Sequence, residues 1–218
     1  MLDNRTLRER ARYQLGGGIF ANDWLLMLAV CAVWSIVSAM ISNATTTESE
    51  EIELLDFVGT MLSWLVCGPF LYGICRAGTK LARGYKVELK DAVSGFQENF
   101  TGSLLLGFLV SLFTCLWTLL LIVPGIVKSY SYAMAHYLRQ DDLSKEKDAV
   151  EYINESKAMM EGYKWQLFCL DLSFIGWYFV GLLCLGIGIF FVVPYHQTAR
   201  ANFYQELRYG FGGAGLNG

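Results

Sequence analysis

The residues of this sequence that stand out for chemistry are three charged side chains inside long apolar stretches: Asp171, Lys128 and Arg200. A charge at the centre of a bilayer costs about 2.5–3.5 kcal/mol on insertion scales, so such residues pair with one another or mark an ion path. Two interpretations of Asp171 are open. It is a proton or cation site, or it forms a structural ion pair with Lys128 or Arg200, with a basic side chain reaching towards the membrane surface.

The only histidines, His136 and His196, each lie on the polar side of a proline-containing segment. Two histidines and an acid are able to bind a metal, but no His-Glu-x-x-His run or comparable spacing is present. Hydrogen bonding at the membrane surface is the simpler interpretation. The sequence therefore predicts no catalytic, metal or cofactor-binding site, and we expect a protein that is not an enzyme.

Composition points to a membrane protein. Hydrophobic residues make up 54% of the 218 residues and charged residues only 17%, whereas soluble domains carry nearer a quarter charged residues. We therefore expect the lipid bilayer as the main partner and no nucleic acid. The cysteines all fall in apolar stretches without a Cys-x-x-Cys pair, which favours small buried side chains over a disulfide framework or a metal site. They are Cys31, Cys67, Cys75, Cys115, Cys169 and Cys184.

Apolar stretches long enough to cross a membrane follow one another along the chain. About 20 helical residues cross a bilayer, so residues 24–42 and 57–75 each predict one span. The stretch 101–138 would measure about 57 Å as one helix, which fits two short spans better than one. Residues 165–207 divide in the same way. The sequence therefore predicts an all-α, polytopic membrane bundle of about six transmembrane helices, arranged as three hairpins.

The placement of charge supports six spans over four. Short cytoplasmic loops collect Lys and Arg, and this bias sets orientation. With six spans, all but one of the 17 basic residues and both termini are cytoplasmic, and only Lys128 lies within the membrane. The acidic segment 43–56 then lies outside. With four spans, Lys128 and the basic residues of the segment 139–164 would all lie outside.

The expected domain organisation is a single membrane domain, residues 1–218, with three proline-containing hairpins. Pro69, Pro124 and Pro194 each fall in the second helix of a hairpin, where we expect a kink. The expected segments are a basic interfacial helix at 1–23, hairpin 1 at 24–75, a cytoplasmic loop at 76–100, hairpin 2 at 101–138, a cytoplasmic amphipathic helix at 139–164, hairpin 3 at 165–207 and a flexible tail at 208–218. A plain solvated helix is the alternative for residues 1–23.

Several motifs resemble one family. They are SKAMMEGYKWQLFCLDLSFIGW (Ser156 to Trp177), GIG at 186–188, PY at Pro194, FY at Phe203, PGIVKSYSYAMAHYL from Pro124, and the early ARYQL. In these the chain resembles the bacterial integral membrane family called domain of unknown function 975. The resemblance implies a multi-pass protein of the bacterial cell membrane, with no activity or catalytic residue to carry over.

We expect a non-catalytic membrane protein that handles a small solute or lipid or supports a membrane complex, alone or as a homo-oligomer. Two alternatives stay open. One is a membrane-embedded enzyme acting on a lipid or peptide, with Asp171 and a histidine as the working pair. The other is a purely structural or immunity-type scaffold without a cavity.

Overall fold

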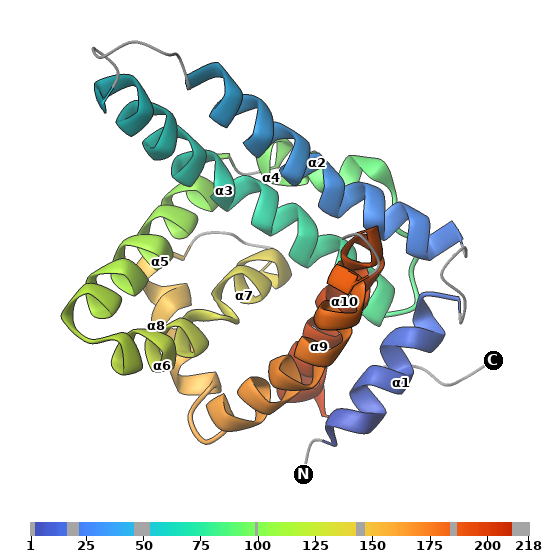
Figure 1. Ribbon diagram of the computed structural model, residues 1–218. Helices are drawn as coiled ribbons and strands as arrows, with labels where there is room; N and C mark the ends of the chain where they lie inside the picture. Colours follow the sequence, from blue (N-terminus) through green and yellow to red (C-terminus); the bar gives the residue numbers. More distant parts are fainter. Residues whose placement is uncertain are drawn as a thin grey trace.

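The chain folds entirely into helices over the residues that the structure describes, which are 3–16, 22–45, 53–98, 100–142, 147–183 and 187–210. Figure 1 shows the computed structural model. The longer helices are α2 (Asn22–Thr45), α3 (Glu53–Ala82), α5 (Phe100–Leu120), α9 (Lys164–Leu183) and α10 (Ile187–Tyr209). The shorter ones are α1 (Asn4–Gln14), η1 (Leu89–Val93), α4 (Ser94–Gln97), α6 (Ile122–Tyr132), α7 (Ala135–Asp141) and α8 (Ala149–Met159).

The long helices pack as three hairpins, α2–α3, α5–α6 and α9–α10, and α3 also contacts both α5 and α10. Among the described residues, three helices are long and apolar enough to cross a membrane by length and composition. They are the first helix of each hairpin: α2 over Asn22–Met40, α5 and α9. The second helix of hairpin 2 differs from our expectation, because α6 ends at Tyr132 and a turn at residues 133–134 separates it from α7.

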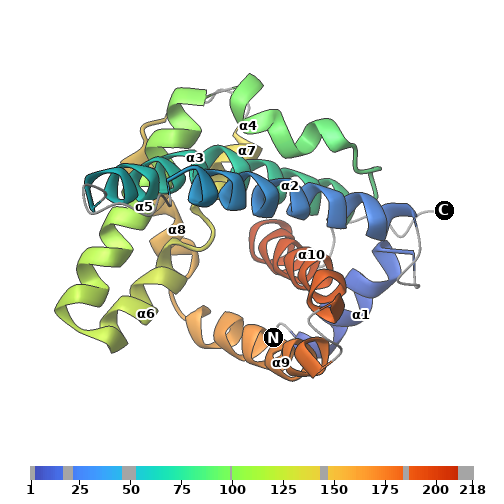
Figure 2. The ribbon, with the colours of Figure 1, turned by 45° about the horizontal axis from the view of Figure 1, so that its top comes forward.

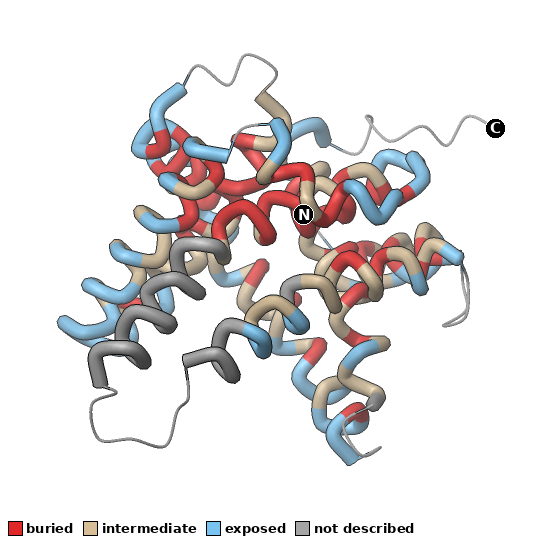
Figure 3. The backbone as a smooth tube through the Cα atoms, turned by 90° about the horizontal axis from the view of Figure 1, so that it is seen from above, coloured by how far each residue is buried: buried red, intermediate tan, exposed pale blue. Residues whose placement is uncertain are grey.

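The hairpins project from a common packed base. Figure 3 shows buried residues gathered where the hairpins meet, and exposed residues along the projecting arms. At the far end of hairpin 2, Leu119 is 84% exposed and Val123 is 71% exposed, and at the end of α9 Leu183 is 75% exposed. Apolar side chains exposed over such long surfaces are typical of helices that contact lipid. The arms of the hairpins therefore expose apolar surface, as helices that associate with a membrane do.

The three prolines occupy two different kinds of position. Pro69 and Pro194 lie inside α3 and α10, the second helices of hairpins 1 and 3. Pro124 lies in the first turn of α6, which begins at Ile122. Backbone N–H groups in a first helical turn have no intrahelical partner, so a proline there removes no hydrogen bond. The expectation that Pro124 kinks the second helix of hairpin 2 is therefore wrong.

Glycines allow close backbone contact where α3 crosses α5. A Cβ atom added to Gly107 would lie 2.3 Å from the Gly68 Cα, so only two hydrogens separate the two helices at this point. Gly181 and Gly188 form the corresponding contact between α9 and α10. Gly176 differs, because a Cβ added there has nothing within 4 Å, so packing does not require a glycine at this position.

Helix α1 buries one face against the rest of the protein. Asp3 begins it by accepting a hydrogen bond from the Arg5 backbone N–H at 3.1 Å. Leu7, Ala11 and Leu15 lie on one face at helical spacing, and all three are completely buried. This face contacts mainly α10. The apolar face of α1 is therefore covered by protein, and the expectation of an interfacial helix at 1–23 stays a prediction.

The polar segments between hairpins pack against hairpin helices: η1 and α4 contact α3 (Figure 2), and α8 contacts α5, α6 and α7. Helix α3 continues past Cys75 to Ala82, so Arg76 and Lys80 are helical and do not belong to a loop. Helix α8 covers only part of the segment 139–164. Its Tyr152 is buried and donates a hydrogen bond to the Asp142 Oδ2 at 3.0 Å. Burial, reinforced by this carboxylate, raises the pKa of Tyr152.

The cysteines of the described residues are free thiols in different surroundings. Cys75 is buried and Cys115 is exposed on α5. The expectation of small buried side chains therefore holds for Cys75 and is wrong for Cys115. Cys184 lies outside the described residues, as do the acidic residues at 48–52 and the tail from 211.

Candidate functional site

The candidate site is a network of polar side chains centred on Asp171, at the eighth position of α9. The Asp171 side chain is only 13% exposed. The guanidinium of Arg200, from α10, binds both carboxylate oxygens: its Nε donates to Oδ1 at 2.9 Å and its Nη2 donates to Oδ2. Two parallel hydrogen bonds of this kind are the strongest geometry available to an ion pair.

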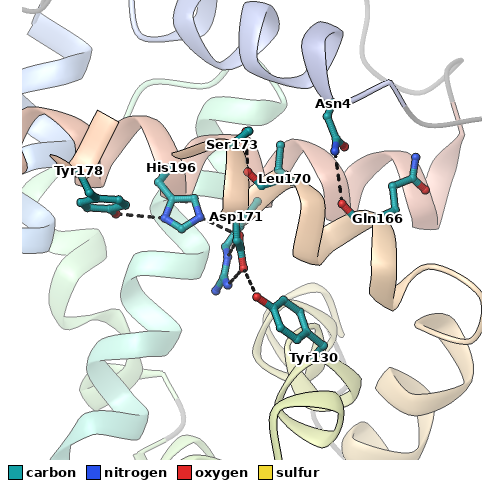
Figure 4. A network of polar contacts seen from close by, with 9 residues as sticks. Asn4, Tyr130, Gln166, Leu170, Asp171, Ser173, Tyr178 and His196 are labelled. Atoms are coloured by element: carbon teal, nitrogen blue, oxygen red, sulfur yellow. Dashed lines mark hydrogen bonds and ion pairs between the residues drawn. The ribbon is translucent and has the colours of Figure 1, made fainter. Parts of the chain in front are cut away.

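His196 joins the same carboxylate from one turn earlier on α10. Its Nε2 lies 2.7 Å from the Asp171 Oδ1, and its Nδ1 lies 3.1 Å from the Tyr178 hydroxyl (Figure 4). Because a carboxylate only accepts, Nε2 carries a proton, and a neutral imidazole then accepts from Tyr178 at Nδ1. The hydrogen bonds therefore run in one direction, from Tyr178 through His196 to Asp171.

Tyr130 connects this network to hairpin 2. Its hydroxyl donates from α6 to the Asp171 Oδ2 at 3.1 Å (Figure 4). The Tyr130 ring also packs edge-to-face against Phe168 of α9, with ring centroids 5.9 Å apart. Helices α6 and α9 contact each other much less than α5 contacts α6 or α9 contacts α10. The hydroxyl of Tyr130 thus links hairpins 2 and 3 by a hydrogen bond.

The carboxylate of Asp171 has no free position left for a substrate, a proton or a cation. Asp171 accepts four hydrogen bonds, two from Arg200 and one each from His196 and Tyr130, which uses the lone-pair positions of a carboxylate. One negative and one positive charge balance, so a neutral His196 leaves the cluster without net charge. Among the described residues, no group of three His, Cys, Asp or Glu side chains is placed to hold a metal ion. The arrangement fits an ion pair better than a cation site or a general base.

Lys128 and His136, the other two predicted site residues, lie elsewhere. The Lys128 ammonium is 4.8 Å from the centroid of the Trp117 ring, a cation–π contact within hairpin 2. His136 is buried in α7, and neither of its ring nitrogens has a hydrogen-bond partner among the described residues. The structure therefore brings together Asp171, Arg200 and His196 and leaves Lys128 and His136 outside the cluster.

Sequence reasoning did not include Tyr130 or Tyr178 in this cluster. Both donate hydrogen bonds within the network. Helical spacing could have indicated Tyr178, because it lies seven residues after Asp171, about two helical turns, on the same face of α9. No such spacing relates Tyr130 to α9, since the two lie on different hairpins.

Two further buried carboxylates at the base were not predicted. Asp91 is 1% exposed and accepts from the Lys80 Nζ at 2.6 Å, with the Arg76 Nε at 3.6 Å. Asp141 pairs with Arg83 and accepts hydrogen bonds from Tyr204 at 2.9 Å and Tyr209 at 2.7 Å. Both lie in polar segments, where sequence alone does not separate a buried acid from a solvated one.

A pocket of about 790 Å³ opens beside these carboxylates at the base. Its charged lining holds as many basic as acidic residues, and half of them pair with one another, in the contacts of Arg76 with Glu98 and of Arg83 with Asp141. The pocket therefore shows no preference for an anion or a cation. Its charged residues are Arg76, Lys80, Arg83, Lys86, Glu88, Glu98, Asp141 and Asp142.

Comparison with known proteins finds one family to which part of the chain is similar. Residues 119–209 match the model of a family described as "Protein of unknown function (DUF975)". This range covers α6 to α10 and contains every residue of the Asp171 network. No curated protein and no solved structure matches the chain.

Proposed function

We propose that this chain, whose residues 119–209 belong to the DUF975 family of unknown function, is a non-catalytic integral protein of the bacterial cell membrane. In this proposal it crosses the membrane six times as three hairpins, with both termini in the cytoplasm. Its hairpins form a scaffold that supports a membrane complex. The Asp171 network is the internal clamp that holds hairpins 2 and 3 in place.

Six spans are supported by the hairpin arrangement and by charge. Each of the three candidate spans is followed by a helix that packs against it and returns to the base. Helix α6 alone measures about 16 Å and is too short to cross, so α6 and α7 together make the return of hairpin 2. The basic residues then gather at the base, as the rule for cytoplasmic loops requires.

The observation that carries the structural role is the saturation of Asp171. A carboxylate that transfers a proton or binds a cation needs an oxygen free to exchange partners. Asp171 instead accepts four hydrogen bonds from two hairpins, and Arg200 compensates its charge. Such a pair is costly to break from one side, at about 3–5 kcal/mol, because the partner is left as a buried charge.

A membrane-embedded enzyme is the second candidate, and one observation favours it. The chain from Tyr178 through His196 to Asp171 orients an imidazole by a carboxylate, as the working base of many hydrolases is oriented. In a hydrolase this imidazole would act on a nucleophile or a water. Here its second nitrogen faces the Tyr178 hydroxyl, so a substrate would have to displace that tyrosine.

One set of variants separates the two candidates. Asp171→Asn alone should lower accumulation in the membrane, because Arg200 loses its counter-charge. The double variant Asp171→Leu, Arg200→Leu replaces the pair by apolar side chains and should restore accumulation. A structural clamp predicts that this double variant also complements a deletion strain. A protein that accumulates normally yet fails to complement would refute the clamp and favour chemistry or ion transfer.

The proposed topology is tested with an amine reagent that does not cross membranes. Lys157 on α8 lies at the base and should react in opened vesicles but not in intact cells. Labelling of Lys157 in intact cells would overturn the arrangement, since the basic segment would then lie outside.

A further inference from the structure

Arg139, in the last turn of α7, is a buried cation without an acidic partner. The residue is only 2% exposed, its Nε has no hydrogen-bond partner, and among the described residues no carboxylate lies within ion-pair distance of its guanidinium. Arginine is seldom buried unless it is paired, because it stays protonated and removing its charge from water is costly. The described part of the chain therefore does not supply the negative group that this position requires.

The acids close to Arg139 in the chain and at the neighbouring pocket have other partners. The Asp142 Oδ2 accepts from the Tyr152 hydroxyl at 3.0 Å, and Glu98 pairs with Arg76. The Tyr152 ring centroid lies 5.4 Å from the Arg139 Cζ, and a ring face attracts a cation without carrying a net charge. The carbonyls that end α7 contribute at most about half a negative charge. These groups hold the guanidinium without neutralising it.

The guanidinium of Arg139 lies against the first turn of α5. A Cβ added to Gly102, the third residue of that helix, would overlap the guanidinium and lie 2.8 Å from its Nη1. Only a glycine at this position leaves room for the group. The first turn of a helix carries a partial positive charge, which repels a guanidinium and attracts an anion. Two positive features of the molecule therefore lie side by side, and an anion bound to both would stabilise both.

The same side of α7 carries a second buried side chain without a partner. His136 precedes Arg139 by three residues, a spacing that places both side chains on one side of a helix. His136 is 3% exposed, and neither of its ring nitrogens is hydrogen-bonded among the described residues. A neutral imidazole has one N–H to donate. Helix α7 therefore offers two nitrogen-bearing side chains that lack acceptors.

We propose that Arg139 and the first turn of α5 form a binding site for a phosphate group. Guanidinium donors match the geometry of phosphate oxygens, and a helix N-terminus favours their negative charge. Helix α5 begins at Phe100, which is 45% exposed, so its first turn is open to the surface. Because α5 is also a candidate span, a lipid headgroup and free inorganic phosphate are both possible sources of the group. The site is separate from the Asp171 network.

Thermal unfolding of the full-length protein in detergent tests the site, with sodium phosphate replacing sodium chloride at constant ionic strength. Phosphate at about ten times its Kd should raise the Tm of the wild type by about 3–6 °C. Arg139→Met lacks the guanidinium and should show no shift. Without phosphate this variant should unfold near or above the wild-type Tm, because it no longer buries an unpaired charge. A large loss of stability there would show that the protein itself compensates Arg139, and would refute the site.

A second variant tests the position of the guanidinium and not its charge. Gly102→Ala keeps every charge and places a methyl group where the guanidinium lies. The end of the arginine side chain is able to move away, so the protein should fold, but phosphate should bind at least about tenfold more weakly. The matched control is Arg5→Gln, which removes one positive charge from an exposed pair with Glu9 and should keep the full wild-type shift.

Equal phosphate shifts in the wild type, Arg139→Met and Gly102→Ala would contradict the proposal, because exclusion of phosphate from the protein surface would then explain the stabilisation.

The two sources of phosphate are distinguished by adding phosphatidylglycerol, or a galactolipid without phosphate, to the detergent micelles. A Tm rise with phosphatidylglycerol alone that Arg139→Met abolishes would support the site and assign it to a lipid headgroup. A rise with inorganic phosphate alone would support it as a site for a soluble anion. The inference fails if neither source raises the Tm of the wild type. The inorganic-phosphate measurement needs no bilayer, so its result does not depend on the proposed function.

Discussion

The crossing of α3 and α5 allows a sharp test of the packing. Gly107→Ala places a methyl group 2.3 Å from the Gly68 Cα and 3.0 Å from its nitrogen. Both are backbone atoms, so no side chain can rotate away. Restoring an ordinary carbon–carbon contact of about 3.5–4.0 Å requires the helices to separate by about 1.5 Å. Overpacking of this kind costs about 1–3 kcal/mol, and the higher helix propensity of alanine offsets at most about 1 kcal/mol.

The matched control is Gly176→Ala, because an added Cβ at this helical position meets nothing within 4 Å. We expect Gly107→Ala to lower the free energy of unfolding by about 1–2 kcal/mol or more, and Gly176→Ala to leave it unchanged or raise it slightly. Denaturant titration in detergent, followed by circular dichroism, measures both. Equal stability of the two variants would show that α3 and α5 do not cross at these glycines.

Three further predictions concern buried charges, each measured by the same unfolding titration. Asp91→Asn should cost about 2–4 kcal/mol because it leaves Lys80 without its carboxylate partner, whereas the exposed Glu88→Gln should leave stability nearly unchanged; equal effects would contradict the burial of Asp91. Lys128→Met should cost under about 1 kcal/mol, whereas Arg200→Met should cost about 3–5 kcal/mol. The reverse order would show that Asp171 pairs with Lys128 and not with Arg200. Tyr130→Phe should cost about 0.5–1.5 kcal/mol through one hydrogen bond, and this loss should vanish in the background of Asp171→Leu, Arg200→Leu.

Helical structure and the order of the apolar stretches were predictable because they depend on local properties. A run of about 20 apolar residues is recognisable without knowledge of its neighbours, and α5 and α9 begin within one residue of the expected positions at 101 and 165. The break near Pro124 was also predictable as a turn, although the proline lies in the first turn of α6 and not in its interior. Apolar runs in the sequence therefore indicated where helices begin more accurately than prolines indicated where helices are kinked.

The partners of the charged residues were not predictable in the same way. Asp171 was expected to pair with Lys128 or Arg200, and both lie in apolar segments after a proline. Arg200 reaches Asp171 because α9 and α10 are consecutive and antiparallel, so positions equally far from their connection lie side by side. Lys128 belongs to hairpin 2, and its direction depends on how that hairpin rotates against α3, where the contact of Gly68 with Gly107 sets the crossing.

The sequence by itself determined that the chain is helical and where its long apolar stretches begin, because hydrophobicity and helix length are properties of a segment alone. The tertiary structure decided that α1 packs on α10, that Tyr130 links hairpin 2 to hairpin 3, and that the side chains of Asp91 and Asp141 are buried. These facts depend on distances between residues far apart in the chain. Such distances follow from the rotation and crossing of whole helices, which no single segment encodes.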